Sequence, residues 1–585
     1  MLIRTESCDV LVVGTGAAGL TAAVTAAKAG KKVILLEKDA VYGGTTAFSG
    51  GMIWIPGNRY SVEMNKKAGT EDSLTIARDY IYDEAGEAMD ANNVEAYLRH
   101  GKEMVDYLER ETEVKFYPMD YPDYVSENPR SRTMRSLCTV NYETRKMGPH
   151  LKTLRNQLPQ TLFLGLAIGS SVEMKEFMRA GRSVKSLLFV LKKLIAHARD
   201  MIVYGRSEQM VRGRALVGRL ARSAFDLGVQ MWLSSPVKDL IKQEGSGLVI
   251  GALVSTPQGE VRVNASGGVI LCCGGFTRDG VRRAAAYPGV AVGRAGAEQI
   301  SVVPETNTGD GVNLAERAGG KFEKNVSQVA PWMPVSKMPG VSGTDGVWPH
   351  LVDRMKPGFI SVARNGKRFA DESSSYHDFI PGLIKASTEL GEKEAAGWIV
   401  ADARAVHRWG MGFARPWPVP KGKYVKNGYL MRADTLAELA QKAGMDAAGL
   451  EATVKQFNEY ALKGVDPDFN RGNRTYDQYQ GDPEVKPNSC LAPLVKAPFY
   501  AVRIYAAEIG TYAGIKTNAN AQVVDADNQP IPGLYAAGND QTSVFAGAYP
   551  GAGSTLGPAM TFGWIAGRHA SGGHLQVRDT NEMLL

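Results

Sequence analysis

The chain has 585 residues, which is too long for one hydrophobic core, so two or three lobes are expected. Hydrophobic residues make up 44% and charged residues 22%, an ordinary composition for a globular enzyme, and no internal repeat or low-complexity tract is present. The net charge is +7, and a basic excess lies between Met174 and Arg206. That segment contains no motif for binding DNA or RNA, so no nucleic-acid partner is expected.

The five scattered cysteines bear on metals and on the cellular compartment. They lack the spacing of metal ligands, and no Cys-x-x-Cys-His segment is present, so neither a metal site nor attached c-type haem is expected. Their odd number fits reduced thiols in a reducing compartment. The first predicted strand begins by about Asp9, which leaves no room for a signal peptide, so a cytoplasmic location is expected.

A glycine-rich turn near the N-terminus, residues 14–19, is called the fingerprint turn below. It follows a short β-branched run that predicts a buried parallel strand, and a helix follows it. Gly14 permits the tight turn, Gly16 lets the backbone approach a pyrophosphate, and Gly19 packs the helix against the strand. A second predicted strand ends in Glu37, whose carboxylate can accept hydrogen bonds from ribose hydroxyls. The pattern predicts dinucleotide binding without separating NAD from FAD.

Residues 43–51, called the flavin loop, follow Lys38 closely and are rich in glycine and hydroxyl groups. This stretch resembles the flavoprotein family of fumarate reductases, succinate dehydrogenases and 3-ketosteroid dehydrogenases, in which it runs beside FAD. No histidine that could bond to the flavin lies between Lys38 and Asn58, so the resemblance implies non-covalent FAD. It implies these cofactor-binding residues: Gly14, Gly16, Ala18, Gly19, Glu37, Lys38, Gly43, Gly44, Thr45, Thr46, Ser49, Gly50, Gly51, Val237, Gly274, Gly538, Asn539, Ser554, Thr555 and Leu556.

The resemblance also implies an architecture. It is an α/β fold: a doubly wound, Rossmann-like FAD-binding domain with an inserted α+β catalytic cap domain. The first part of the FAD-binding domain is expected at residues 1–279, with a basic and apolar insertion at about 150–210. The cap is expected at residues 280–497, and the second part of the FAD-binding domain at 498–585.

Two positions distinguish this chain from the fumarate reductases. Those enzymes deliver a proton from an arginine four residues after an Arg-Phe-x-x-Glu segment, where this chain has Tyr376 after Arg368–Glu372. Their second arginine lies in a C-terminal glycine-rich turn, which here reads Tyr549-Pro-Gly-Ala-Gly553 and is called the C-terminal turn. Phenolic groups in place of cations suit a neutral ketone better than a dicarboxylate.

The C-terminal turn and the Thr-Leu-Gly-Pro-Ala-Met-Thr-Phe-Gly segment after it resemble the 3-ketosteroid Δ1-dehydrogenases. The resemblance implies that the Tyr549 hydroxyl and the Gly553 N–H hold the C3 ketone oxygen. It implies that Tyr376 removes the C2 proton with Tyr124 as relay, while the C1 hydride goes to flavin N5. Tyr121, together with these three tyrosines, is expected to line the pocket of a 3-ketosteroid. The electron acceptor that reoxidises the flavin stays unknown.

Other functions stay open on the residues alone. A 3-ketosteroid Δ4-(5α)-dehydrogenase and a fumarate-reductase-like enoate reductase are the enzymatic alternatives, and a flavin-binding electron-transfer protein is the non-enzymatic one. Ser554 departs from the glycine that is frequent at its position, which leaves the acceptor preference open. His377 is an alternative to Tyr124 as proton relay, although a sequence neighbour of the base usually points elsewhere.

Residues 158–206 hold the basic excess and two apolar runs. The first run contains a proline and two glycines and is too short to span a bilayer. The second, SLLFVLKKLIAHA at residues 186–198, predicts an amphipathic helix flanked by lysine and arginine. Such a helix either docks on the FAD-binding domain or lies in the membrane interface with its cations on lipid phosphates. A hydrophobic substrate favours peripheral contact with the inner face of the membrane through this segment.

Overall fold

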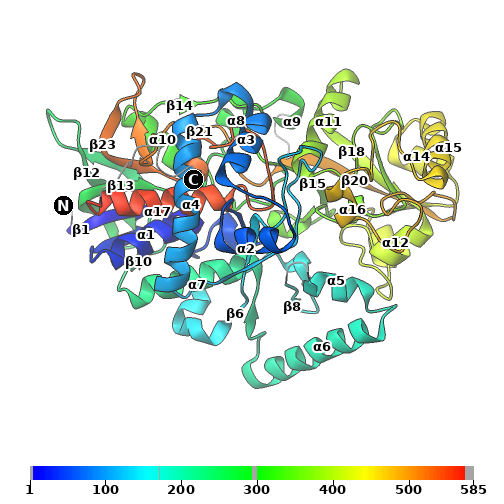
Figure 1. Cartoon of the computed structure of the whole chain (residues 1–585), viewed down its shortest axis with the longest axis horizontal. Helices are drawn as coiled ribbons and strands as arrows, with labels where there is room; N and C mark the ends of the chain where they lie inside the picture. The colour runs from blue at the N-terminus through cyan, green and yellow to red at the C-terminus, as the bar shows by residue number, and fades with distance from the viewer. Residues whose placement is uncertain (1–3, 170–171, 293–298, 574–585) are drawn as a thin grey trace.

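The computed structural model describes residues 4–169, 172–292 and 299–573, and its two largest sheets lie next to each other along the longest axis (Figure 1). In the first sheet, four parallel strands lie side by side: β10 (Gln230–Trp232), β2 (Val33–Leu36), β1 (Arg4–Val13) and β13 (Gly259–Leu271). Beyond β13 come the antiparallel strands β12 (Val249–Thr256) and β11 (Val237–Lys242). A fifth parallel strand, β23 (Pro530–Ala536), also pairs with β13 and carries β22 (Gln522–Val524).

Successive residues of β1 pack on opposite faces of this sheet. Val10 and Val12 pack with the helices α1 (Ala17–Lys28), α7 (Arg212–Asp226) and α17 (Leu556–Ala570). Leu11 and Val13 face the other side, together with Leu314 of α10 (Asp310–Arg317). A strand buried on both faces reads as a continuous apolar run, as the sequence does here. The predicted α/β fold is confirmed.

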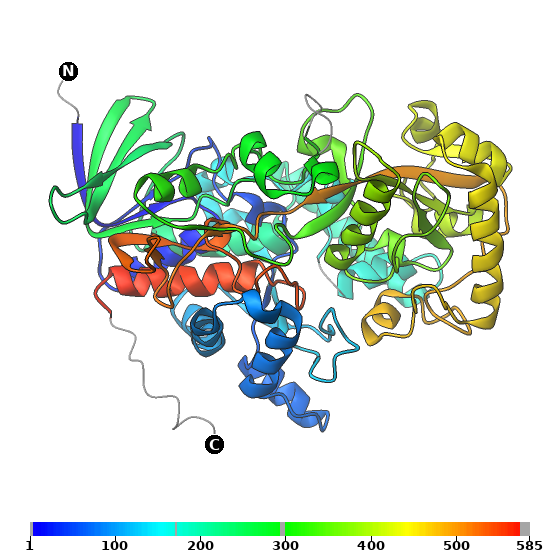
Figure 2. The same ribbon diagram turned by 90° about the horizontal axis from the view of Figure 1, so that it is seen from above.

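The second sheet is antiparallel and forms the core of the cap. Its order is β16 (Val347–Pro349), β15 (Trp332–Lys337), β20 (Phe499–Glu508), β18 (Ala396–Ala401) and β17 (Phe359–Val362), and β19 (Met431–Ala433) also pairs with β20. Figure 2 shows β20 as the long strand that runs into this sheet. Because β20 follows residue 497, where the cap was expected to end, the second sheet extends further along the chain than the sequence indicated. An apolar strand pattern does not reveal which sheet the strand joins.

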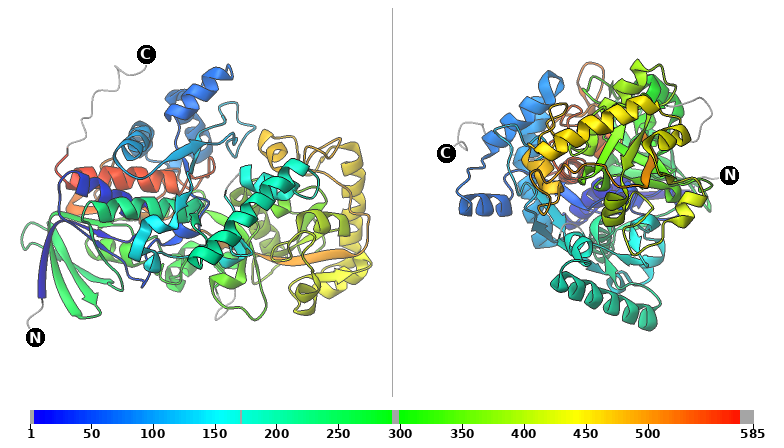
Figure 3. Two further views of the ribbon diagram at one scale, coloured as in Figure 1. Left: turned by 90° about the horizontal axis from the view of Figure 1, so that it is seen from below. Right: turned by 90° about the vertical axis from the view of Figure 1, so that its right-hand side faces the viewer.

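The insertion between the first-sheet elements holds α5 (Val172–Arg179) and α6 (Val184–Tyr204). Ser183 caps α6 by accepting a hydrogen bond from the Ser186 N–H, and Gly205 ends the helix at a φ of +68°. Seen from below, α6 crosses the outside of the molecule between the two sheets (Figure 3). In the described ranges, no helix combines the length and the apolar character needed to cross a bilayer.

Candidate active site

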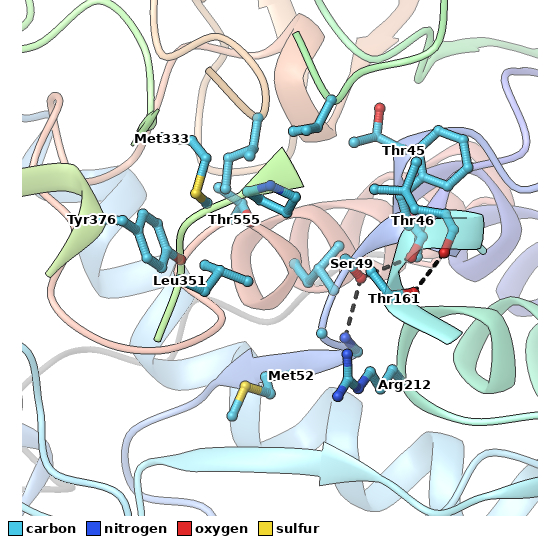
Figure 4. Close-up of a pocket in the computed structure, with 18 of the residues that line it drawn as sticks. Thr45, Thr46, Ser49, Met52, Thr161, Arg212, Met333, Leu351, Tyr376 and Thr555 are labelled. Atoms are coloured by element: carbon cyan, nitrogen blue, oxygen red, sulfur yellow. Dashed lines mark hydrogen bonds between the residues drawn. The ribbon is translucent and has the colours of Figure 1, made fainter. Parts of the chain in front are cut away.

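One cavity of about 1050 Å³ extends from the fingerprint turn into the cap. Its lining comes from the flavin loop, the C-terminal turn, the second sheet and the α5–α6 insertion. Figure 4 shows Thr45, Thr46 and Ser49 of the flavin loop on one side, with Tyr376 and Met333 of the cap on the other. The cavity therefore joins a nucleotide end, at the first sheet, to a substrate end, under the cap.

The glycines of the fingerprint turn divide into packing and lining positions. A methyl group at Gly14, whose φ is +103°, would overlap the Cys272 carbonyl oxygen, and one at Gly19 would overlap the Gly14 oxygen. At Gly16 the nearest atom to an added methyl group is the Thr46 hydroxyl oxygen, at 3.5 Å. Gly16 thus faces open cavity, where a backbone N–H at a helix start can meet phosphate.

Most of the residues expected to bind the cofactor line this cavity. Those that line it are Gly14, Gly16, Ala18, Glu37, Lys38, Gly44, Thr45, Thr46, Ser49, Gly50, Gly51, Val237, Gly274, Gly538, Asn539, Thr555 and Leu556. Gly19, Gly43 and Ser554 lie behind the lining, where they hold its backbone in place. The Gly43 N–H donates to the Thr15 hydroxyl (2.9 Å), and the Gly551 N–H donates to the Ser554 hydroxyl (3.0 Å).

A buried carboxylate at the end of β2 tests whether a dinucleotide fits. Glu37 accepts the Thr15 hydroxyl and N–H (3.3 Å for the N–H) and the Asp39 N–H (3.0 Å), and burial raises its pKa. A carboxylate offers about four acceptor positions, so Glu37, which lines the cavity, keeps one for a ligand. The ribose hydroxyls of FAD fit this position.

A second buried acid, which the sequence did not single out, ties two glycine-rich segments together. The Asp540 carboxylate accepts the N–H groups of Cys273 (2.5 Å) and Gly275 (3.0 Å), and burial raises its pKa to about 6. It thereby joins the end of β13 to the 538–540 turn, on which Gly538 and Asn539 line the cavity.

At the substrate end, the three tyrosines expected to be catalytic meet. The Tyr124 and Tyr376 hydroxyl oxygens are 3.4 Å apart. The Tyr549 ring stacks on the Tyr124 ring with centroids 5.4 Å apart and meets the Tyr376 ring edge-on at 5.3 Å. Tyr121 lines the same cavity, and its hydroxyl accepts a hydrogen bond from the Gln480 side chain. The three phenols come from segments more than 100 residues apart in sequence, yet form one buried cluster.

Tyr376 begins α11 (Tyr376–Glu389), and a buried ionic network holds this helix start. Glu372 pairs with Arg368 (2.6 Å) and Arg471 (3.0 Å), all three fully or nearly fully buried, and these cations hold the pKa of Glu372 below its usual value. Arg354 donates to the Ser374 carbonyl oxygen (2.8 Å). The Arg-Phe-x-x-Glu segment thus positions the residue that follows it, because breaking one partner would leave a buried charge uncompensated.

Tyr124 is tied to the C-terminal turn through the backbone. Its N–H donates to the Pro550 carbonyl oxygen (3.0 Å), which also accepts the Tyr80 hydroxyl (2.9 Å). The neighbouring Asp123 carboxylate accepts the Trp54 indole N–H (2.8 Å) and pairs with Arg135 (2.7 Å). Early and late segments of the chain are therefore locked together before any ligand binds.

Gly553 completes this arrangement. Its φ is +103°, and a side chain there would approach the Ile53 Cα within 2.6 Å, so only glycine fits. Within the described part of the chain, the Gly553 N–H donates to no protein acceptor. Gly553 and Tyr549 both line the cavity, so both have donors available to a ligand oxygen.

The electrostatics of the cluster keep the phenols neutral. Burial raises the pKa of Tyr376 and of Tyr124 well above the ordinary value of a phenol, while their mutual hydrogen bond lowers that of Tyr376. Burial lowers the pKa of His377, whose Nδ1 accepts the Trp332 N–H (3.3 Å). His377 is absent from the cavity lining and packs against the Tyr549 ring, which favours the structural interpretation of this histidine.

Several lining residues were not expected from the sequence. They are Tyr476, whose ring is 4.9 Å from that of Tyr124, and Met52, Met333, Arg212, Lys356 and Arg415. The α6 residues Leu187, Val190 and Leu194 and the segment 407–419 also contribute to the lining. Tyr476 had no motif to mark it among 23 tyrosines. The others come from segments whose approach to the site depends on tertiary packing.

The fold and this cavity define a flavoprotein. A family model described as "FAD binding domain" matches residues 9–556, and the chain belongs to this family. FAD is its cofactor, and the glycine-rich lining with Glu37 is where it fits.

Similar proteins include enzymes named for a small ring acid and enzymes named for steroids. The chain is 40% identical to 4-oxocyclohex-2-ene-1-carboxylate 5-dehydrogenase of Sinomonas cyclohexanicum, over 97% of this chain and 94% of the relative. It is 34% identical to 3-oxosteroid 1-dehydrogenase of Mycobacterium tuberculosis, over 96% and 98%. The crystal structure of 3-ketosteroid Δ1-dehydrogenase from Sterolibacterium denitrificans, in complex with 1,4-androstadiene-3,17-dione, superposes with a TM-score of 0.89 and 32% identity, covering 97% of this chain and all of that one.

Proposed function

We propose that this protein is an FAD-dependent dehydrogenase that introduces a carbon–carbon double bond next to the ketone of a six-membered ring. For a 3-ketosteroid the new bond joins C1 and C2. The observation that carries the proposal is the buried contact among Tyr124, Tyr376 and Tyr549 beside the free N–H of Gly553.

The chain's own residues divide the work. The Tyr549 hydroxyl and the Gly553 N–H bind the ketone oxygen and stabilise the negative charge that develops on it. Tyr376, acting as its tyrosinate, accepts the proton from the carbon next to the ketone, and Tyr124, 3.4 Å away, hydrogen-bonds to it as the relay. The chemistry that FAD would supply when bound is that of a two-electron acceptor for the hydride on the next carbon. One proton and one hydride leave, so the substrate is oxidised by two electrons.

Two substrate classes fit this chemistry. An apolar cavity that reaches α5 and α6 supports a 3-ketosteroid, including long-tailed sterones such as cholestenone. A specific observation favours a smaller, charged ring ketone: Arg212 lines the cavity, and its guanidinium pairs with no carboxylate in the described ranges. The 40% identical relative named for an oxocyclohexene carboxylate supports the same class.

We also propose that α6 contacts a membrane surface of anionic lipid. Its outer face carries an exposed apolar stripe: Val184, Leu188, Leu191, Ile195 and Ile202. Exposed cations at seven-residue spacing, Lys185, Lys192 and Arg199, run beside that stripe, as in interfacial helices. The inner face of the same helix lines the cavity, so a lipid-borne substrate would enter there.

The decisive experiment mixes the anaerobic, flavin-loaded protein with ring ketones and follows bleaching of the flavin absorbance. The panel contains a 3-ketosteroid, 4-oxocyclohexane-1-carboxylate and fumarate, and the mass and bond position of each product are determined. Bleaching by a ring ketone, with a new double bond next to the carbonyl, supports the proposal. A Δ4 product would indicate the Δ4-(5α) alternative. Oxidation of dye-reduced protein by fumarate alone would indicate a reductase, and the absence of any turnover would favour an electron-transfer protein.

A further inference from the structure

Arg212, the first residue of α7, has an unusual backbone and an unusual location. Its φ is +54°, a left-handed conformation that residues other than glycine seldom adopt. Its backbone lies directly against Gly51, where an added methyl group would overlap the Arg212 carbonyl carbon. Its side chain lines the cavity, and Figure 4 shows it next to Ser49 and Met52. A strained backbone that places a cation in a cavity points to a ligand.

The Arg212 guanidinium lacks a counter-ion. In the described part of the chain no carboxylate oxygen lies within 4.0 Å of it, and its buried Nε–H has no hydrogen-bond partner. Among the described residues, its guanidinium makes one hydrogen bond, a long one of 3.4 Å to the Gly169 carbonyl oxygen. The nearby carboxylate of Glu173 is already bound by Lys193 (2.7 Å). An arginine stays charged in a protein, so a desolvated one is stabilised when an anion binds beside it.

The other unpaired cations of the cavity have acceptors of their own. The Lys356 ammonium donates to the Gln480 carbonyl oxygen at the end of α16 (Thr475–Gln480) and to that of Gly481 (3.3 Å). Arg415 donates to the carbonyl oxygens of Gln160 and Leu162 and lies over the Trp348 ring at 4.6 Å. Both therefore have structural roles, whereas Arg212 has no comparable acceptor.

The location of Arg212 favours the substrate, rather than the cofactor phosphates, as the anion that it binds. Arg212 interacts electrostatically with Tyr117 and Cys138, and Cys138 pairs with Met52 across the small sheet of β3 (Met52–Trp54) and β5 (Ser136–Thr139). The fingerprint turn meets the flavin loop at Thr46, whereas Arg212 meets that loop at Gly51, next to Met52. Met52 packs against the tyrosine cluster and lines the cavity with it.

The backbones of Arg212 and Gly553 meet nearby positions of the same early segment. Arg212 lies against Gly51, and Gly553 lies against Ile53, with only 2.6 Å between an added Gly553 methyl group and the Ile53 Cα. Residues 51 and 53 are two positions apart, or roughly 7 Å of extended chain. A six-membered ring with a substituent at each end spans a comparable length.

We propose that Arg212 binds the carboxylate of the substrate, and that the substrate is a six-membered ring ketone with a carboxylate on the carbon across the ring from the ketone. This inference rests on the proposed function. With Tyr549 and Gly553 on the ketone and Arg212 on the carboxylate, both ends of the ring are held, and the C–H bonds between them face Tyr376. Arginine suits this role because its planar N–H groups bind a carboxylate in pairs.

The test compares an acid with its neutral ester in matched variants. Wild type, Arg212→Gln, Arg212→Lys and the control Arg415→Gln are assayed with 4-oxocyclohexane-1-carboxylate and with its methyl ester. Arg212→Gln is expected to raise KM for the acid on the order of 10- to 100-fold, the loss typical of one charge-assisted pair, while KM for the ester stays close to the wild-type value. Arg212→Lys should recover part of the loss, and Arg415→Gln should not discriminate between acid and ester.

Three outcomes would overturn the inference. The first is that Arg212→Gln raises KM equally for the acid and the ester. The second is that Arg212→Gln loses its flavin or shifts the flavin potential, and the third is that Arg415→Gln is the variant that discriminates between acid and ester.

A binding experiment with 4-hydroxybenzoate, followed through its effect on the flavin spectrum, separates this inference from the proposed function. Its phenolate imitates the enolate and its carboxylate lies across the ring. If wild type binds it, Arg212→Gln does not, and no ketone is oxidised, the proposed function fails while the carboxylate site stands. If wild type and Arg212→Gln bind 4-hydroxybenzoate equally well, Arg212 is not the carboxylate site.

Discussion

At the nucleotide end of the cavity, the contacts are made by backbone: glycines of the fingerprint turn and the flavin loop, held by Thr15, Thr46 and Glu37. At the substrate end, the contacts are made by side chains from the early Tyr124 segment, the cap and the C-terminal turn. Backbone geometry of this kind depends on short, local sequence patterns. Side-chain chemistry at the other end depends on which distant segments meet, and it is free to change with the substrate.

This difference has an energetic side. At the nucleotide end, most polar groups already have partners, and the ligand adds to a finished structure. At the substrate end, Gly553 offers an unused N–H and Arg212 an unused charge. Polar groups that lack a hydrogen-bond partner lower the free energy of unfolding, and a ligand that binds them raises it again. Such groups therefore indicate where a ligand binds. Substitutions at the two ends should therefore have different effects, on flavin retention at one end and on turnover at the other.

Replacing Gly16 by valine should abolish FAD retention and with it all activity. The apoprotein should still fold, because an added methyl group meets no atom closer than 3.5 Å, whereas the phosphates would lose their approach to the backbone. The flavin absorbance of the purified variant and its circular dichroism measure the two effects. Gly289→Ala, at an open position, is the control. Flavin that stays attached to the wild-type chain after acid precipitation would contradict non-covalent binding.

Tyr376→Phe should reduce kcat by about 10²–10⁴-fold, the usual contribution of a general base, while flavin content and ligand affinity change little. Stopped-flow reduction of the flavin measures the loss directly. Tyr512→Phe is the matched control, because Tyr512 belongs to the same buried cluster but is absent from the cavity lining, and its hydroxyl is buried without a partner. Wild-type activity in Tyr376→Phe would show that another group takes the proton.

Tyr549→Phe should lose rate and ketone affinity together, by roughly 3 kcal/mol at the transition state, or about 100-fold in kcat/KM. The Gly553 N–H remains as the second donor, so the loss stays partial. Steady-state kinetics with the methyl ester used above isolates this effect from the carboxylate contact. A change in flavin binding alone would instead place Tyr549 at the nucleotide end.

The rate should rise with pH across the alkaline range. Burial raises the pKa of Tyr376 well above its ordinary value, so at neutral pH only a small fraction is tyrosinate. That fraction grows about tenfold for each pH unit below the pKa. The rate of flavin reduction, measured between pH 7 and pH 10, should therefore keep increasing. A plateau above neutral pH would indicate a base that is already deprotonated there, as a histidine with its ordinary pKa of about 6.5 would be.

The smallest effect concerns α6. Vesicles with anionic lipid should bind the protein weakly and release it with salt, because Lys185 and Lys192 lie beside the exposed apolar stripe. Lys185→Glu with Lys192→Glu should reduce flotation, while Lys455→Glu on α15 (Ala447–Lys463) should not. Lys193 is a poor choice for this test because it pairs with Glu173. Absence of flotation at low salt would leave α6 as a helix that only covers the cavity.

Much of the nucleotide end could be predicted because its signals are local. The fingerprint turn, the strand that precedes it and Glu37 lie within 40 residues, and their spacing alone implies the βαβ geometry. Tyr376 and Tyr549 were identified by their place in motifs, and the structure brings them into contact. Which sheet β20 joins could not be predicted, because an apolar alternating strand pairs equally well with either.

By itself, the sequence determined the class of cofactor, the α/β fold and the candidate phenols, since each depends on residues close together or on a recognisable motif. Only the tertiary structure decided that Tyr476, Arg212 and the inner face of α6 line the same cavity as those phenols. The physical reason is that charge and exposure are properties of an environment. In the sequence, Arg212 is one of many basic residues, and it lies at the start of a helix. In the fold its Nε–H is buried, and among the described residues this group has no hydrogen-bond partner.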